Sequence, residues 1–190
     1  MIFYIITKDM SQFYKDLPNK LTTIRLWSIP FMVFFILLFN QHLLSRFIAT
    51  ILFIVVAFTD YFDGYFARKY KAESNFGQCF DNIADKALIV SLLFVLVSQK
   101  RADVLPCIAI SLREIIISGI REFLGNKQIT LHVTLLAKWK TTLQLIAIGI
   151  LIASKPNTML SNLGIIVLWV SALITLITMY DYIKNTVKHF

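Results

Sequence analysis

Residues 60–85 read DYFDGYFARKYKAESNFGQCFDNIAD, and they interrupt a chain that is otherwise largely apolar. The stretch contains four aspartates: Asp60, Asp63, Asp81 and Asp85. On insertion scales, an aspartate at the centre of a membrane helix costs about 2.5–3.5 kcal/mol. A chain that keeps four of them together is expected to use them, and binding of divalent cations is the use that we predict.

The composition around this stretch is that of a polytopic membrane protein. The chain has 190 residues, of which 57% are hydrophobic and 16% are charged, and its mean hydropathy is +0.71. Soluble domains carry about 25% charged residues. The net charge of +8 is also found in nucleic-acid-binding proteins, but here the basic residues cluster at the ends of apolar segments. No contiguous basic face is visible, so we expect no nucleic-acid partner.

Six apolar segments, separated by turn-forming residues, are each near the ~20 residues that cross a bilayer. They are Thr22–Phe39, Leu44–Tyr65, Gly77–Val97, Val104–Phe123, Thr134–Ala153 and Leu160–Ile183. The predicted fold class is therefore all-α, a single membrane domain over residues 1–190 with six transmembrane helices. Residues 1–16 form an N-terminal extension that suits a short interfacial helix.

The distribution of Lys and Arg predicts the orientation in the membrane. One side of the six-span arrangement receives Lys8, Lys15, Lys20, Arg25, Arg68, Lys69, Lys71, Arg121, Lys127, Lys138, Lys140, Lys184 and Lys188. The other side receives Arg46, Lys100, Arg101 and Lys155. The positive-inside rule therefore places both termini and the aspartate motif on the cytoplasmic face of the cell membrane.

The spacing of the motif predicts two opposed helical faces. The motif positions in the second span share one face: Asp60, Asp63, Gly64, Ala67 and Arg68. Those in the third span share another: Gly77, Asp81 and Asp85. Carboxylates crowded in this way cannot all stay ionised without a compensating cation. Because carboxylate oxygens suit hard cations, we expect Mg²⁺ or Mn²⁺ rather than zinc.

Two carboxylates on each of two helices indicate a pair of metal ions. Paired metals about 3.5–4 Å apart are typical of phosphoryl transfer, where they clamp the attacking and leaving oxygens. The small residues Gly64, Ala67 and Gly77 would let a diphosphate approach the backbone, and Arg68 offers a planar fork for phosphate. Two other readings stay open: aspartates that pair with Arg68 and Lys86 to hold the helices, and a proton or cation relay in a transporter. No helix interface requires this many acids, and the relay reading does not explain Gly64, Ala67, Arg68 and Gly77 on the same faces.

The eight motif positions, with every spacing kept, resemble the signature of the CDP-alcohol phosphatidyltransferase family. Three further segments resemble the branch that makes phosphatidylglycerophosphate. They are residues 17–25 with Pro30, residues 113–122 and residues 138–144. The sequence departs from the family pattern at Asn82, where many relatives have proline, and at Ala137, where glycine is usual; neither departure removes a ligand.

The resemblance implies roles for individual residues. Two ions, Mg²⁺ or Mn²⁺, would be held by Asp60, Asp63, Asp81 and Asp85, with Asp85 also the catalytic general base. Cytidine diphosphate would be bound by Asn19, Thr22, Gly64, Ala67, Arg68 and Gly77. The acceptor phosphate would be bound by Arg113, Arg121, Lys138 and Lys140. The alternative for these basic residues is snorkelling toward the membrane surface.

The resemblance also implies the reaction and the partners. The expected enzyme is a homodimer among membrane lipids that transfers the phosphatidyl group of CDP-diacylglycerol to sn-glycerol 3-phosphate and releases CMP. The basic residues of the fourth and fifth spans favour a phosphorylated acceptor. Serine, inositol phosphate and phosphatidylglycerol remain as alternative acceptors within the same family.

Overall fold

The computed structural model describes the backbone of residues 23–38, 42–70, 75–126 and 135–187. Side chains are described in the same ranges except at 60–81, 126, 135–138 and 187. All regular secondary structure within these ranges is helical, which confirms the all-α prediction. The predicted N-terminal extension, Asn19 and Thr22 lie outside the described residues.

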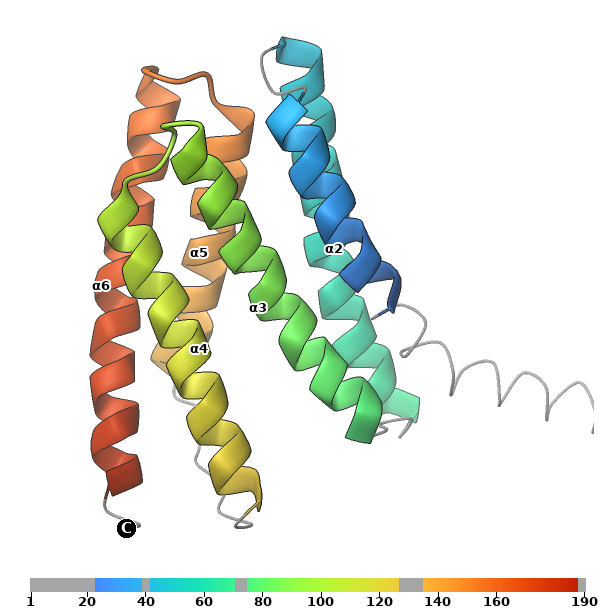
Figure 1. Cartoon of the computed structure of the whole chain (residues 1–190), viewed down its shortest axis with the longest axis vertical. Helices are drawn as coiled ribbons and strands as arrows, with labels where there is room; N and C mark the ends of the chain where they lie inside the picture. The colour runs from blue at the N-terminus through green and yellow to red at the C-terminus, as the bar shows by residue number, and fades with distance from the viewer. Residues whose placement is uncertain (1–22, 39–41, 71–74, 127–134, 188–190) are drawn as a thin grey trace, which may run out of the picture. The chain divides into compact units, whose positions relative to one another are not determined.

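The helices occur in the order and at the positions that the apolar segments predict (Figure 1). A first helix, Thr23–Leu38, is followed by α2 (Leu43–Tyr70), α3 (Asn75–Ser98), α4 (Val104–Asn126), α5 (Leu135–Ala153) and α6 (Met159–Val187). The largest difference is that α2 continues past its expected end at Tyr65 to Tyr70. Good helix formers such as Ala67, Arg68 and Lys69 extend the helix after the apolar run has ended.

Local sequence signals explain where helices begin and end. At the end of α3, Arg101 N donates to Leu96 O at 2.8 Å and Lys100 N to Val97 O at 2.9 Å, with Lys100 at a φ of 56°. This is a Schellman cap, in which the left-handed residue turns the chain out of the helix. At the start of α6, Thr158 Oγ1 accepts from Ser161 N at 3.3 Å, which is an N-cap.

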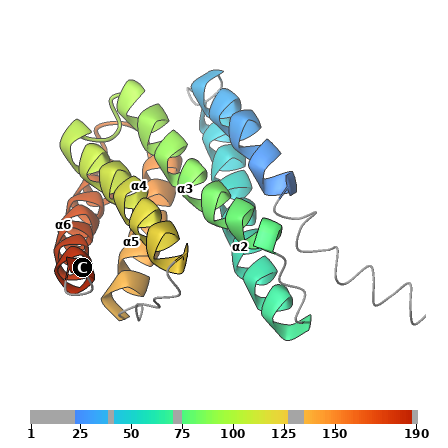
Figure 2. The same ribbon diagram turned by 60° about the horizontal axis from the view of Figure 1, so that its bottom comes forward.

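The chain divides into two compact units, residues 1–88 and 89–190, with the boundary inside α3. In the first unit, the Thr23–Leu38 helix lies beside α2 in both ribbon views (Figures 1 and 2). The buried apolar side chains of this unit include those of Ile29, Met32, Ile36, Ala49 and Phe53. The prediction of a single domain over residues 1–190 stays a prediction.

The second unit is built around α6, which packs against both α5 and α4. Its core includes the fully buried side chains of Ile110, Ile148, Leu151 and Leu168. A Cβ atom at Gly164 would lie 2.9 Å from Leu151 Cδ2, so the close approach of α5 and α6 favours glycine at this position.

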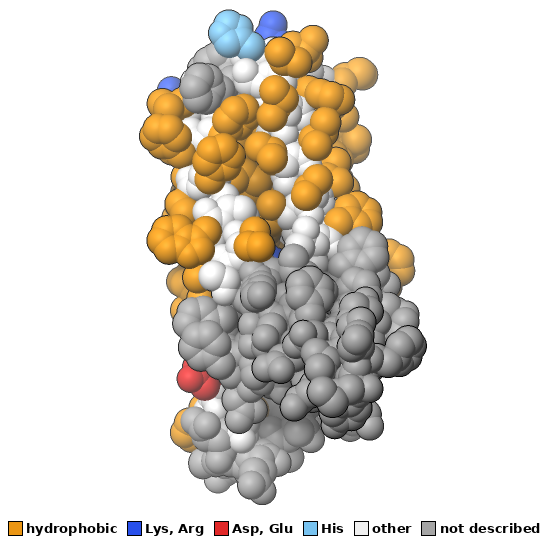
Figure 3. Space-filling view, turned by 90° about the vertical axis from the view of Figure 1, so that its right-hand side faces the viewer, with side chains coloured by type: hydrophobic (Ala, Val, Ile, Leu, Met, Phe, Trp, Pro, Cys, Tyr) orange, Lys and Arg blue, Asp and Glu red, His pale blue; other side chains and the backbone are white. Residues whose placement is uncertain are grey.

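Many large apolar side chains are exposed along the helices, and several polar and charged side chains are buried. Trp27 is 75% exposed and Phe47 is 63% exposed in the first unit, and hydrophobic side chains cover much of the described face in Figure 3. In the second unit, Arg113 and Lys140 are both 4% exposed. By length and composition, α6 is the one helix in the described part of the chain that could cross a membrane. An apolar surface together with charged residues that face the protein interior is typical of proteins embedded in lipid.

Candidate functional site

The aspartate motif lies where α2 ends and α3 begins, within the first unit. The chain runs down α2 and returns along α3 (Figure 1). Asp60 lies ten residues before the end of α2 and Asp85 ten residues after the start of α3. Asp63 and Asp81 lie seven and six residues from the same ends. At ~1.5 Å per residue, the two aspartates of each helix therefore lie about one turn apart along its axis.

Asp85 is the motif aspartate whose side chain the structure describes, and it forms an ion pair. Arg25 Nη1 donates to Asp85 Oδ1 at 2.9 Å. The arginine side chain is 1% exposed, whereas the aspartate side chain is 43% exposed. Arg25 therefore fixes a carboxylate that other molecules can still reach. The sequence shows Arg25 as a charged residue in an apolar helix, but it does not reveal this partner.

The donor chemistry of the motif fits a hard divalent cation, although three of its four carboxylates lie outside the described side chains. The carboxylate of Asp85 is partly exposed and is oriented by its ion pair with Arg25. Carboxylate oxygens are ligands that Mg²⁺ and Mn²⁺ prefer. Among the described side chains, no group of three or more His, Cys, Asp or Glu gathers. The four-aspartate metal site remains a prediction, as do the roles of Gly64, Ala67, Arg68 and Gly77.

A second set of charged residues is buried in the second unit, between α4 and α5. Glu114 Oε1 accepts hydrogen bonds from Lys140 Nζ and, at 3.3 Å, from Arg113 Nη1. All three residues are less than 10% exposed. Arg113 Nε is also buried and has no hydrogen-bond partner among the described residues. Buried charges are retained only where they are paired, and the orphaned Nε leaves one donor for a further acceptor.

Arg121 belongs to the same electrostatic environment. Its guanidinium lies 5.6 Å from the ring centroid of Tyr182 on α6, in a cation–π contact. It also acts electrostatically on both Arg113 and Lys140. The structure thus brings together three of the four predicted acceptor-site residues, and the side chain of Lys138 lies outside the described ones. Three positive charges and the one negative charge of Glu114 give this basic cluster a formal charge of +2, which suits a phosphate dianion.

The sequence analysis gave no site role to four polar residues of the second unit: Glu114, Gln144, Thr175 and Ser171. Glu114 forms ion pairs with both Arg113 and Lys140. Its position next to Arg113 in the sequence could have indicated the first of these pairs. Gln144 Nε2 donates to Thr175 Oγ1 at 3.1 Å in the interior of the unit. Gln144 Oε1 and Ser171 Oγ are buried and have no hydrogen-bond partner among the described residues. No local sequence pattern predicts which buried amide forms a hydrogen bond with which hydroxyl group.

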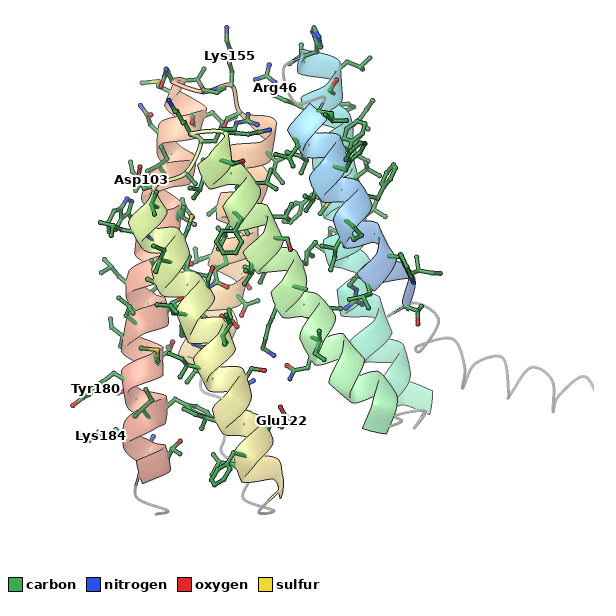
Figure 4. All side chains as sticks on the ribbon, viewed as in Figure 1. Arg46, Asp103, Glu122, Lys155, Tyr180 and Lys184 are labelled. Atoms are coloured by element: carbon green, nitrogen blue, oxygen red, sulfur yellow. The ribbon has the colours of Figure 1, made fainter. Side chains whose placement is uncertain are left out.

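Charged residues mark the two ends of the second unit (Figure 4). Asp103 and Lys155 lie toward one end, where Arg101 also donates to the carbonyl of Ser154. Glu122 and Lys184 lie toward the other end, and the basic cluster belongs to this half because Glu122 follows Arg121 directly.

Comparisons with known proteins point to one family. The family model described as CDP-alcohol phosphatidyltransferase matches residues 15–177. A protein of Rickettsia felis named CDP-diacylglycerol–glycerol-3-phosphate 3-phosphatidyltransferase is 41% identical over 179 residues, which covers 93% of this chain and 98% of that protein. Proteins with the same name from Cereibacter sphaeroides and Haemophilus influenzae are each 35% identical, covering 92% and 89% of this chain and 96% and 92% of their own lengths.

Proposed function

This chain belongs to the CDP-alcohol phosphatidyltransferase family, and from that premise we propose that it transfers the phosphatidyl group of CDP-diacylglycerol to sn-glycerol 3-phosphate. The products are phosphatidylglycerophosphate and CMP. The observation that carries this proposal is the similarity, over nearly the full length of both chains, to relatives named for that reaction. The basic cluster, in which Arg113 and Lys140 are buried, supports a phosphorylated acceptor.

The aspartates are proposed to act at the diphosphate. Asp60, Asp63, Asp81 and Asp85 would hold two ions, Mg²⁺ or Mn²⁺, which supply positive charge to the diphosphate when bound. Asp85 takes the proton of the attacking acceptor hydroxyl, whose oxygen forms the new bond to the phosphatidyl phosphorus as the bond to CMP breaks. The ion pair with Arg25 supports this role, because it holds Asp85 in one orientation.

The remaining site residues are proposed to bind the two substrates. Asn19, Thr22, Gly64, Ala67, Arg68 and Gly77 are assigned to the cytidine diphosphate group. Arg113, Arg121, Lys138 and Lys140 are assigned to the acceptor phosphate, which would complete the hydrogen bonding of the buried Arg113 Nε. Arginine suits this task because its planar fork matches phosphate oxygens.

The proposed setting is the cell membrane, crossed by six helices with both termini and the site on the cytoplasmic side. Exposed apolar side chains on the helices and buried polar ones support a lipid environment. In this setting, membrane lipids would contact the exposed apolar side chains of the helices. A homodimer is proposed from the family resemblance, and chemical crosslinking of the protein in native membranes tests it by the presence or absence of a dimer band.

An acceptor panel tests the reaction most directly. Membranes containing the protein receive CDP-diacylglycerol, Mg²⁺ or Mn²⁺, and glycerol 3-phosphate, serine, inositol phosphate or phosphatidylglycerol. We expect CMP release with glycerol 3-phosphate and labelled phosphatidylglycerophosphate as the lipid product. Preference for serine would contradict the proposed acceptor. Ion flux in proteoliposomes without any CMP release would favour the transporter reading instead.

A further inference from the structure

The Gln144 side chain on α5 has one end fixed and the other end without a partner. Gln144 Nε2 donates to Thr175 Oγ1 on α6 at 3.1 Å, and the residue is 1% exposed. Its Oε1 is buried and has no hydrogen-bond partner among the described residues. Buried polar atoms in folded proteins are nearly always hydrogen-bonded. Because Nε2 is anchored and Oε1 has no partner, the amide of Gln144 points to a ligand group that hydrogen-bonds to it.

The position of Gln144 relates it to the basic cluster. It lies four residues after Lys140, which places both on the same face of α5 about 6 Å apart along the axis. Lys140 in turn donates to Glu114, beside Arg113. On α6, Thr175 precedes Tyr182 by seven residues, or two turns of one face, and Tyr182 lies under Arg121. Both helices thus carry a line of polar residues from the glutamine to the cations.

We propose that Gln144 is a specificity-determining residue that hydrogen-bonds the secondary hydroxyl of the three-carbon acceptor while the basic cluster binds its phosphate. This inference rests on the proposed function. The Thr175 hydroxyl can both donate and accept, so it anchors the amide in either orientation. A substrate hydroxyl can likewise accept from Nε2 or donate to Oε1, so the pairing holds for both orientations.

A hydroxyl is the group that this location favours. The amide is neutral and buried, and Ser171, one turn before Thr175 on α6, is 0% exposed. A second charge here would carry a large desolvation cost, whereas a hydroxyl needs one hydrogen bond. A site built to bond a substrate hydroxyl discriminates strongly against an analogue that lacks it, because the site's own polar group is then left unpaired.

The test compares two acceptors that differ by this hydroxyl. Glycerol 3-phosphate carries it; 3-hydroxypropyl phosphate keeps the phosphate and the reacting primary hydroxyl but lacks it. With the full-length protein in membranes and CDP-diacylglycerol as donor, kcat/KM for glycerol 3-phosphate should exceed that for the analogue by about tenfold or more. In Gln144→Met, which keeps the side-chain length, the ratio should fall to about one while turnover of the analogue changes less than about twofold.

Two further variants separate this role from a general effect on packing. Thr175→Val removes the anchor of the amide and should also lower the preference, which provides a second probe if Gln144→Met does not accumulate. Thr178→Val is the matched control. Its hydroxyl is buried on the same helix but donates to the carbonyl of Thr175 at 3.0 Å, so the preference should persist.

Three outcomes would overturn the proposal. Equal use of both acceptors by the wild-type protein would do so without any variant. A uniform loss of both activities in Gln144→Met would assign the glutamine a purely structural role. Turnover of neither acceptor by folded wild-type protein would overturn the proposed function itself, and the proposal with it.

Discussion

Arg25 and Asp85 are separated by 60 residues in sequence, yet their side chains form an ion pair with 2.9 Å between Nη1 and Oδ1. The arginine belongs to the Thr23–Leu38 helix and the aspartate is the last residue of the four-aspartate motif. Because the arginine is buried and the aspartate is partly exposed, the first helix sets the orientation of a carboxylate that remains reachable. The residue proposed as the base is thus positioned from outside its own motif.

The Asp85→Asn variant tests the base assignment, since asparagine keeps the size of the side chain but cannot take up a proton. We expect CMP release to fall by about 10²–10⁴-fold, the usual contribution of a general base. The measurement is CMP formed from CDP-diacylglycerol and glycerol 3-phosphate by membranes with equal amounts of protein. Asp181→Asn, at an exposed position of α6, serves as the control and should keep the wild-type rate. Wild-type turnover by Asp85→Asn would remove the assignment.

The Arg25→Gln variant tests whether the arginine positions Asp85. Displacing a reacting group by about 1 Å can cost on the order of 10²-fold, so we expect kcat to fall by about 10- to 100-fold. The KM for glycerol 3-phosphate should stay near its wild-type value, because the acceptor phosphate is assigned to other residues. Arg25→Lys keeps one charged donor and should recover part of kcat. A rise in KM with unchanged kcat would assign Arg25 to substrate binding instead.

Lys140→Met should weaken acceptor binding. The loss of one charge-assisted hydrogen bond, worth about 1.5–3 kcal/mol, predicts a KM for glycerol 3-phosphate raised by about 10- to 100-fold. The KM for CDP-diacylglycerol should not change. Lys184→Met is the matched control, because Lys184 is exposed at the same end of the second unit (Figure 4). An equal effect of the two substitutions would mean that the contribution is general surface charge.

Glu114→Gln should destabilise the second unit. Removing one partner of a buried ion pair costs about 3–5 kcal/mol, because the opposite charge is left uncompensated, and here two cations share Glu114. Thermal unfolding of the detergent-solubilised protein should shift to lower temperature. Glu114→Gln combined with Lys140→Met should recover part of the loss, since the double variant buries one cation fewer. A double variant less stable than either single one would contradict this explanation.

Cysteine labelling tests the proposed orientation in the membrane. In a background with Cys79 and Cys107 replaced by alanine, Lys155→Cys should react with a membrane-impermeant thiol reagent added to the outer side of the membrane. Lys184→Cys should react only after the cytoplasmic side is opened. Both lysines are exposed, at opposite ends of the second unit. Labelling of Lys184→Cys from outside would reverse the orientation.

The helices and the motif spacing could be predicted from the sequence because they depend on neighbouring residues. The apolar segment Val104–Phe123 corresponds to α4 at Val104–Asn126, and Thr134–Ala153 corresponds to α5 at Leu135–Ala153. Backbone hydrogen bonds close within four residues, so a run of apolar helix formers between turn residues defines a helix locally. The sequence also allowed Arg113, Arg121 and Lys140 to be assigned to one site, because they are basic residues within predicted apolar helices.

The sequence by itself determined the six helices, the two-helix aspartate motif and the family to which its spacing points. Only the tertiary structure decided which polar groups meet: Arg25 with Asp85, Glu114 with Arg113 and Lys140, and Gln144 with Thr175. These partners lie on different helices, except for the adjacent Arg113 and Glu114. A helical period states which face of a helix a residue occupies, but the packing of one helix on another selects its partner, because burial requires each charge and amide to find a complementary group.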